Sequence, residues 1–306
     1  MIKLANTDLT VYPLCLGGNV FGYSADKENS EAVLSFYADN GGNFIDTADM
    51  YSQWAPGHIG GESETIIGNW MKKRGNRSQM IIATKVGKLD TKPGLSPSNV
   101  ISACEDSLKR LGSDYIDIYY SHQDDLDTPI EQSLGAYDSL IKAGKVRYIA
   151  ASNFTPERLQ ESLDISKELN LASYIASQDQ YNLMEREYES TLRDVLEKNN
   201  LSQIPFYGLA RGFLTGKYRP RASVASVRAT GVSNAYGNEC GWTMLEKLDQ
   251  IAKERNTSVA SISLAWLRAQ ETVSAPIASA TKLEQIKEIM PIVELSNQEL
   301  QTLTNS

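Results

Sequence analysis

Two apolar segments of the chain each lead directly into a residue that can carry charge. Residues 43–45 precede Asp46, and residues 80–84 precede Lys85. A carboxylate at the end of a buried strand is costly unless it is paired, so we expect the Lys85 ammonium to pair with Asp46. Tyr51 follows Asp46 in a predicted loop, where its phenol could serve as a proton donor.

A phenol is a slow acid at neutral pH, because its usual pKa is about 10. A cation about 4 Å away interacts with a phenolate by about 4 kcal/mol at an effective dielectric near 20, enough to lower a pKa by about three before desolvation is subtracted. We therefore expect Lys85 to lower the pKa of Tyr51, while Asp46 keeps the lysine charged. His122 ends a further predicted strand, from which its ring could hydrogen-bond a substrate carbonyl.

The elements that must position these residues alternate along the chain between strand-like and helix-like patterns, which is typical of repeated βα units. Amphipathic segments such as 98–111, 130–143 and 156–169 predict helices, and Gly112 and Gly144 are placed to end two of them. Residues 3–10 predict a short β-hairpin before the first of eight candidate strands. Those strands are 11–16, 43–46, 80–85, 115–120, 146–152, 174–180, 204–207 and 272–277.

Eight such units, with no linker or compositional break between them, predict one domain over residues 1–306. We expect an α/β fold, a closed (β/α)8 TIM barrel with a short N-terminal β-hairpin, in preference to a doubly wound open sheet. Every strand of a barrel delivers its carboxyl end to the same face. Taken singly, each of the four residues could be an ordinary polar group near a strand end, but their convergence favours a catalytic site.

Four runs of sequence carry these residues: GNFIDTADMY at 42–51, ATK at 83–85, HQDD at 122–125 and KAGKVRYIAASNF at 142–154. Together they resemble the aldo-keto reductase superfamily, and the resemblance covers nearly the whole chain. It implies a (β/α)8 barrel, a nicotinamide cofactor lying across the carboxyl-end face, and a catalytic tetrad. The tetrad residues would be those already reached above, namely Asp46, Tyr51, Lys85 and His122.

The same resemblance assigns contacts to the nicotinamide. Ser152, Asn153 and Gln178 would hold its carboxamide by hydrogen bonds. Phe206 would stack on its ring, and Tyr207 would take that role if the alignment slips by one residue.

The rest of the cofactor would be held by two further segments, according to the resemblance. The run 209–218 resembles the loop that crosses the pyrophosphate, with contacts from Leu209, Arg211, Gly212, Leu214 and Lys217. The run 279–285 resembles the segment that holds the adenosine 2′-phosphate and adenine, with contacts from Ser279, Thr281, Lys282 and Gln285. A helix amino terminus with a lysine suits a phosphate, so NADPH is favoured over NADH. Ile289 departs from the family, where an asparagine that contacts adenine is common.

The substrate would lie beside the tetrad, in contact with Asn19, Phe21 and Trp54. We expect Val20, Tyr23 and residues 234–242 to complete the rim of the pocket. The hypothesis is the metal-free reduction of a small-molecule aldehyde or ketone by NADPH, with Tyr51 as the proton donor. One alternative is a ketoreductase of sugars or nucleotide-linked sugars, and another is a nicotinamide-sensing regulatory subunit with little turnover.

The composition excludes several other classes. The formal net charge of -8 disfavours nucleic acid or an anionic membrane as a partner, because both bind positively charged protein surfaces. No stretch approaches the roughly 18 apolar residues of a membrane helix or resembles a signal peptide, so a cytoplasmic location is expected. Three separated cysteines and two isolated histidines predict neither a disulfide framework nor a metal site. The sequence gives no basis for predicting an oligomeric state.

Overall fold

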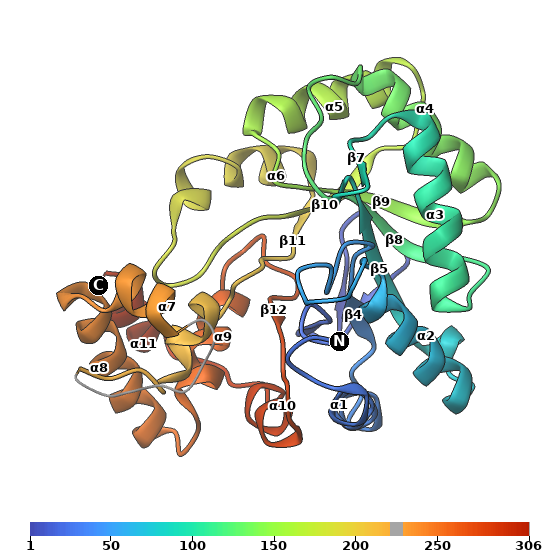
Figure 1. Cartoon of the computed structure of the whole chain (residues 1–306). Coiled ribbons are helices and arrows are strands. Elements are labelled where there is room, and N and C mark those ends of the chain that lie inside the picture. Colours follow the sequence, from blue (N-terminus) through green and yellow to red (C-terminus); the bar gives the residue numbers. More distant parts are fainter. Residues whose placement is uncertain (221–228, 306) are drawn as a thin grey trace.

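Eight parallel strands form a single curled sheet in the computed structural model, which describes residues 1–220 and 229–305. Each strand pairs in parallel with its neighbours, and helices flank the sheet (Figure 1). In order across the sheet the strands are β11 Ser202–Gln203, β10 Tyr174–Gln178, β9 Val146–Ser152, β8 Ile116–Ser121, β5 Ile81–Val86, β4 Phe44–Asp46, β3 Cys15–Gly17 and β12 Ile277–Ala278.

The two edge strands, β11 and β12, are the shortest of the sheet. A bridge joins Gln203 to Val273, and the Ile277 amide donates to the Pro205 carbonyl at 2.9 Å. This curled sheet is consistent with a (β/α)8 barrel, but no ladder joins β11 to β12 among the described residues, so the barrel is not closed as predicted. The bounds of the last two strands differ from the predicted 204–207 and 272–277, because isolated contacts and not a continuous ladder hold these segments together.

The helices lie outside the sheet, and Figure 1 shows α1 to α6 following one another around it. Short 3₁₀ helices occupy Arg77–Gln79, Glu187–Ser190 and Ala210–Thr215. The α-helices are α1 Lys27–Asp39, α2 Glu62–Arg74, α3 Pro97–Leu111, α4 Ile130–Lys142, α5 Pro156–Glu168, α6 Arg193–Asn199, α7 Ala229–Tyr236, α8 Glu239–Glu254, α9 Val259–Arg268, α10 Leu283–Ile289 and α11 Asn297–Thr304.

Local signals explain why the predicted helices 98–111, 130–143 and 156–169 match α3, α4 and α5 to within one residue at each end. Ser96 caps α3 by accepting a hydrogen bond from a backbone amide, and Pro97 occupies the first turn, where a missing N–H costs nothing. Gly112 ends α3 with φ at 59°, a left-handed conformation that glycine adopts without strain.

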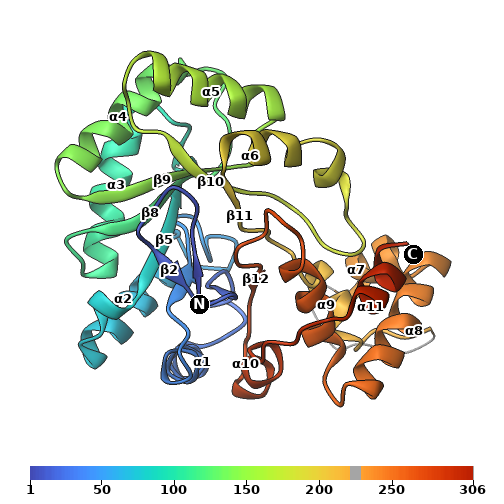
Figure 2. The ribbon, with the colours of Figure 1, turned by 180° about the vertical axis from the view of Figure 1, so that it is seen from behind.

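The N-terminal hairpin is confirmed. Strands β1 Ile2–Lys3 and β2 Thr10–Val11 pair antiparallel. Leu4, Leu9 and Val11 are buried in one hydrophobic cluster with side chains of the sheet strands. Seen from behind, the hairpin lies across the sheet (Figure 2). It therefore covers one end of the sheet interior and leaves the carboxyl ends of the strands for a site.

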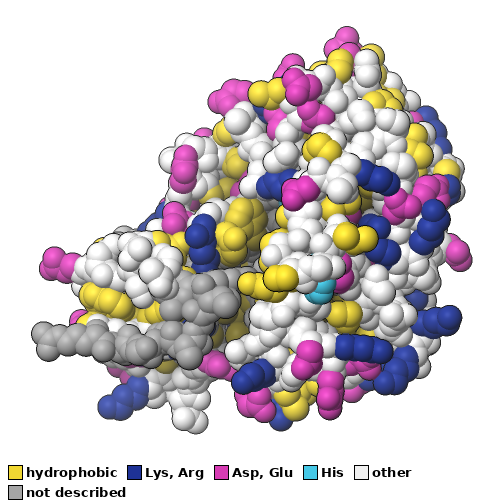
Figure 3. Space-filling view, viewed as in Figure 1, with side chains coloured by type: hydrophobic (Ala, Val, Ile, Leu, Met, Phe, Trp, Pro, Cys, Tyr) yellow, Lys and Arg dark blue, Asp and Glu magenta, His cyan; other side chains and the backbone are white. Residues whose placement is uncertain are grey.

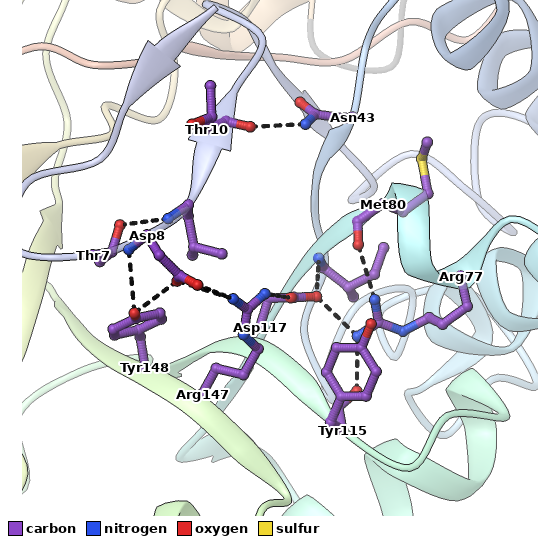
Figure 4. A network of polar contacts seen from close by, with 12 residues as sticks. Thr7, Asp8, Thr10, Asn43, Arg77, Met80, Tyr115, Asp117, Arg147 and Tyr148 are labelled. Carbon is purple, nitrogen blue, oxygen red and sulfur yellow. Dashed lines mark hydrogen bonds and ion pairs between the residues drawn. The ribbon is translucent and has the colours of Figure 1, made fainter.

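A buried carboxylate links this hairpin to the sheet (Figure 4). Asp117 accepts hydrogen bonds from Arg77 at 2.8 Å, from the Ile82 amide at 3.0 Å and from Arg147 at 2.8 Å. Arg147 also pairs with Asp8 of the hairpin at 2.9 Å. Each oxygen of Asp117 is satisfied, which is what a carboxylate needs in order to be buried.

None of the helices in the described residues is long and apolar enough to cross a membrane. Cys15 and Cys104 are buried free thiols, whereas Cys240 is exposed.

Candidate active site

Lys85 lies at the centre of the site, without any solvent exposure. Its ammonium donates to Asp46 Oδ2 at 2.6 Å, to the Thr47 carbonyl at 2.8 Å and to the Tyr51 hydroxyl at 2.9 Å. Strands β4 and β5 are neighbours in register, which brings the two ionised side chains together. A lysine ammonium has three donors, and here all three are used, so its position is fixed.

Asp46 accepts two more hydrogen bonds. The Tyr51 hydroxyl donates to Oδ2 at 3.1 Å, and Gln178 Nε2 donates to Oδ1 at 2.9 Å. The Tyr51 hydroxyl thus accepts a hydrogen bond from Lys85 and donates one to Asp46. Its proton is therefore part of a hydrogen-bonded network.

The electrostatics of Tyr51 differ from the expectation based on Lys85 alone. Burial raises the pKa of the Tyr51 phenol well above its usual value of 10, and the negative charge of Asp46 acts in the same direction. Burial also lowers the pKa of Lys85, against the opposing effect of Asp46. Desolvation outweighs the attraction of an ammonium whose charge Asp46 already matches. Tyr51 therefore keeps its proton throughout the neutral range.

His122 follows the end of β8, with its ring centroid 6.0 Å from that of Tyr51. Burial holds the pKa of His122 well below 6.5, and the positive charges of Lys85 and Lys88 add to the effect. Its Nδ1 is buried without a partner among the described residues. The ring is therefore neutral at physiological pH and can present one N–H to a carbonyl oxygen.

A cavity of about 900 Å³ opens beside these side chains. Asp46, Tyr51 and His122 line it, while Lys85 lies buried behind them. Figure 3 shows this face hollowed between helices α7 to α9 and the rest of the molecule, with hydrophobic side chains along the hollow. The cavity also collects most residues expected to bind cofactor or substrate, namely Asn19, Trp54, Ser152, Asn153, Gln178, Phe206, Leu209, Arg211, Gly212, Lys217, Ser279, Thr281, Lys282 and Gln285.

Two expected contact residues do not line this cavity. Phe21 and Leu214 are fully buried in the main hydrophobic core. Phe21 lies in a tight turn bridged to Ala25, which directs its ring inward, whereas its neighbour Val20 lines the cavity. Leu214 lies in the 3₁₀ helix Ala210–Thr215. Its backbone carbonyl accepts a hydrogen bond from the Ser263 hydroxyl of α9 at 3.1 Å. Residues 234–242, expected at the rim, fall in α7 and the start of α8 and contribute nothing to the lining.

The expected nicotinamide-binding residues are tied together and to the tetrad. Ser152 donates to the Gln178 carbonyl at 2.7 Å, and Asn153 Nδ2 donates to the His122 carbonyl at 2.9 Å. Asp179 accepts from the Asn153 amide at 3.1 Å and supports its left-handed backbone, with φ at 58°. Asp179 lies within the predicted strand 174–180, but no sequence pattern predicted this role for it.

The two candidate aromatic residues lie side by side, with ring centroids 5.1 Å apart. Phe206 packs against the hydrophobic cluster inside the sheet, whereas the guanidinium of Arg211 lies 4.9 Å over the Tyr207 ring. The two rings therefore offer different surfaces to the cavity.

The cavity lining also carries positive charge. Arg211, Lys217 and Lys282 line it, together with the acidic Glu288. Gly212 has φ at 98°, and a Cβ there would come within 3.1 Å of the Lys217 ammonium, so glycine lets the loop lie close to that charge. These residues fit a phosphate-bearing dinucleotide. No group of three or more metal-ligating side chains occurs among the residues that the structure describes.

Comparison with known proteins agrees with this geometry. The sequence profile of the aldo/keto reductase family matches residues 13–306. The chain belongs to the aldo/keto reductase family. This aldo/keto reductase is 30% identical to an uncharacterized oxidoreductase, YrpG, of Bacillus subtilis, over 96% of its own length and 90% of that protein.

Two other relatives are named for different functions, one as a reductase and one as a channel subunit. The chain is 31% identical to the L-glyceraldehyde 3-phosphate reductase of Escherichia coli K12, over 88% of this chain and 80% of that protein. It is 30% identical to a probable voltage-gated potassium channel subunit beta of Oryza sativa, over 96% of this chain and 90% of that protein. Membership supports an oxidoreductase that acts on carbonyl groups, and aldo/keto reductases generally use NAD(P)H.

Proposed function

We propose that this aldo/keto reductase reduces aldehydes or ketones to alcohols with NADPH, and that Tyr51 is the proton donor. The observation that carries the proposal is the hydrogen-bonded set of Tyr51, Lys85 and Asp46 at one end of the cavity. The substrate carbonyl would lie between the Tyr51 hydroxyl and the His122 ring.

The chain's own residues supply the proton and stabilise charge. A bound nicotinamide would supply the hydride for the carbonyl carbon. Tyr51 gives its proton to the carbonyl oxygen, and the ammonium of Lys85 at 2.9 Å then stabilises the phenolate. His122 donates a hydrogen bond to the same oxygen as negative charge develops there. Asp46 holds the lysine in place, and solvent later returns the proton to Tyr51.

NADPH is favoured over NADH by charge. Arg211 and Lys282 line the cavity together with three residues of the tetrad. The 2′-phosphate of NADPH adds negative charge that such side chains bind. Ser152, Asn153 and Gln178 would hold the nicotinamide, with Phe206 packed on its ring.

Two alternative functions would use the same site. A ketoreductase of sugars or nucleotide-linked sugars would use the same chemistry on a larger, hydroxylated substrate. The channel-subunit name of the Oryza sativa relative favours, as a second candidate, a nicotinamide-binding regulatory subunit with little turnover. The complete tetrad supports the enzyme over the regulatory subunit.

A cofactor-oxidation screen tests the proposal. The purified protein is mixed with NADPH or NADH and with panels of aldehydes, ketones and keto-sugars, and loss of the reduced cofactor is followed by absorbance. We expect turnover with NADPH, and a fall in kcat of about 10²- to 10⁴-fold in Tyr51→Phe, which lacks the transferable proton. Tight NADPH binding without turnover on any panel would favour the regulatory subunit. Wild-type turnover by Tyr51→Phe would exclude Tyr51 as the donor.

A further inference from the structure

A lysine outside the tetrad lines the catalytic end of the cavity. Lys88 is half-buried and shares the lining with Tyr51, Trp54 and His122. It lies on β6 Lys88–Leu89, which pairs antiparallel with β7 Lys92–Pro93. The sequence patterns did not predict this small ladder.

Side-chain hydrogen bonds fix the backbone of Lys88 beside the loop that carries the proton donor. Gln53 Nε2 donates to the Lys88 carbonyl at 3.5 Å and to Asp90 Oδ1 at 3.2 Å, and Gln53 Oε1 accepts from the Asp90 amide at 3.2 Å. Gln53 lies between Tyr51 and Trp54 in the chain. The position of Lys88 relative to the catalytic loop is therefore set by three contacts.

No carboxylate among the described residues forms an ion pair with Lys88. Asp90, two residues away, accepts from Gln53 instead, and Asp46 is paired with Lys85. The other acidic lining residue, Glu288, belongs to α10. The catalytic end of the cavity thus contains a positive charge that these acidic groups leave unmatched.

The charge of Lys88 interacts electrostatically with Lys85 and His122. Burial lowers the pKa of Lys88, and the neighbouring charge of Lys85 lowers it further. Lys88 in turn helps to lower the pKa of His122. A partly desolvated ammonium gains most from a negative partner, because a charge-assisted hydrogen bond replaces the lost hydration.

We propose that Lys88 selects carbonyl substrates that carry an anionic group, either a carboxylate or a phosphate, a few atoms from the reacting carbonyl. This inference rests on the proposed reduction at Tyr51 and names its substrate class. The anionic group remains unchanged in the reaction while hydride and proton add across the C=O bond. Trp54, which contacts the Tyr23 ring edge-on at 5.9 Å, supplies an apolar wall for the carbons between the two ends.

Matched pairs of substrates test the inference. One pair is 4-oxobutanoate and butanal, which tests a carboxylate, and the other is glyceraldehyde 3-phosphate and glyceraldehyde, which tests a phosphate. In Lys88→Met we expect kcat/KM to fall by about 10- to 100-fold for the anionic member that the site prefers. We expect kcat/KM for the neutral member to change by less than about twofold in Lys88→Met. We expect Lys88→Arg, which keeps the positive charge, to retain most of the preference for the anionic member.

Lys92→Met is the matched control. Lys92 is on the partner strand β7, is exposed and is paired with Asp106 at 2.7 Å, so its removal changes the charge of the same ladder outside the cavity. The inference is overturned if Lys88→Met lowers kcat/KM equally for the neutral and the anionic substrates. It is also overturned if Lys92→Met causes the same selective loss of kcat/KM for the anionic substrate. It is also overturned if the wild-type protein reduces the substrates but shows no higher kcat/KM for either anionic member than for its neutral partner.

A binding measurement separates this inference from the proposed function. Succinate and 3-phosphoglycerate are titrated into the protein with NADP⁺ present, and tryptophan fluorescence reports binding. We expect the Kd of the preferred anion to rise by about tenfold or more in Lys88→Met. If no carbonyl compound is reduced but this Lys88-dependent binding is found, the anion site is supported and the proposed reduction fails. Equal binding by wild type and Lys88→Met overturns the anion site even if reduction is observed.

Discussion

The Lys85 ammonium donates a hydrogen bond of 2.9 Å to the Tyr51 hydroxyl from a position without solvent exposure. The same ammonium contacts Asp46 at 2.6 Å. Because Asp46 matches its charge, the lysine is a fixed donor and not a free cation. Its effect on Tyr51 is therefore greatest after proton transfer, when the phenolate needs a partner.

Lys85→Met should reveal this dependence in the pH profile. We expect kcat for aldehyde reduction to fall by about 10²- to 10³-fold, since a preorganised charge next to the developing phenolate is lost. The wild-type alkaline limb should begin below pH 10.5, because burial lowers the pKa of Lys85, and it should be absent from the variant. Tyr51 cannot supply that limb, since its pKa lies well above 10. Steady-state kinetics across pH, with Asp46→Asn for comparison, measure both effects. An unchanged alkaline limb in Lys85→Met would assign it to another group.

His122 should stay neutral down to mildly acidic pH. Its pKa lies well below 6.5 in the folded protein, so kcat should change little between about pH 7.5 and about pH 6 on account of this ring. The unfolded state gains a proton below pH 6.5 that the folded state does not hold, so the ring should lower stability as the pH falls through that value. NMR titration is direct, because the chain has two histidines and His122→Asn identifies the signal. A His122 signal that titrates near pH 6.5 would contradict this prediction.

Lys282 should set part of the cofactor preference. It is exposed and lines the cavity. We expect Lys282→Met to raise KM for NADPH by about tenfold, and KM for NADH by less than about twofold, because one charge-assisted contact with the 2′-phosphate is lost. Lys287→Met is the control, since Lys287 is on α10, which begins directly after Lys282, faces the Phe36 ring and does not line the cavity. A parallel rise for both cofactors would place Lys282 elsewhere on the dinucleotide.

Asp49 should make the protein less stable as the pH rises. Its side chain is buried, and neither carboxyl oxygen has a partner among the described residues. Burial raises the pKa of Asp49 to about 7, and the negative charge of Glu64 contributes. Between about pH 4 and about pH 7 the folded state keeps a proton that the unfolded state has lost, so the free energy of unfolding should fall by up to about 4 kcal/mol over that window.

Asp49→Asn removes this titration. We expect the variant to be more stable than wild type at about pH 8, with the difference shrinking towards about pH 5. Urea unfolding at several pH values measures it, and Asp39→Asn, which changes an exposed carboxylate, serves as the control. A difference that does not vary with pH would show that Asp49 is already ionised in the folded protein at all of these pH values.

The sequence predicted the parts of the site that depend on local pattern. Apolar runs that end at Asp46, Lys85 and His122 located three strand ends, and the common direction of parallel strands then brought them to one face. Gly112 marked the end of α3 for an equally local reason. The resemblance supplied the cofactor contacts, and all of those named except Leu214 line the cavity. Of the residues expected around the substrate, Phe21 and residues 234–242 do not line it.

Where a side chain points inside a turn, and what surrounds it, could not be read from the chain. Phe21 and Leu214 are turned inward by backbone bends whose direction depends on distant segments, and Lys88 reaches the cavity because β6 pairs with β7. The pKa of Tyr51 also moved opposite to the sequence-based expectation, since burial by the whole fold outweighs one neighbouring charge. The chain alone was enough to predict which groups meet at the carboxyl ends of the strands, because the strands are local patterns and parallel strands share one direction. Their protonation and the unmatched charge beside them follow from the folded protein, because desolvation and pairing depend on every segment that packs around the site.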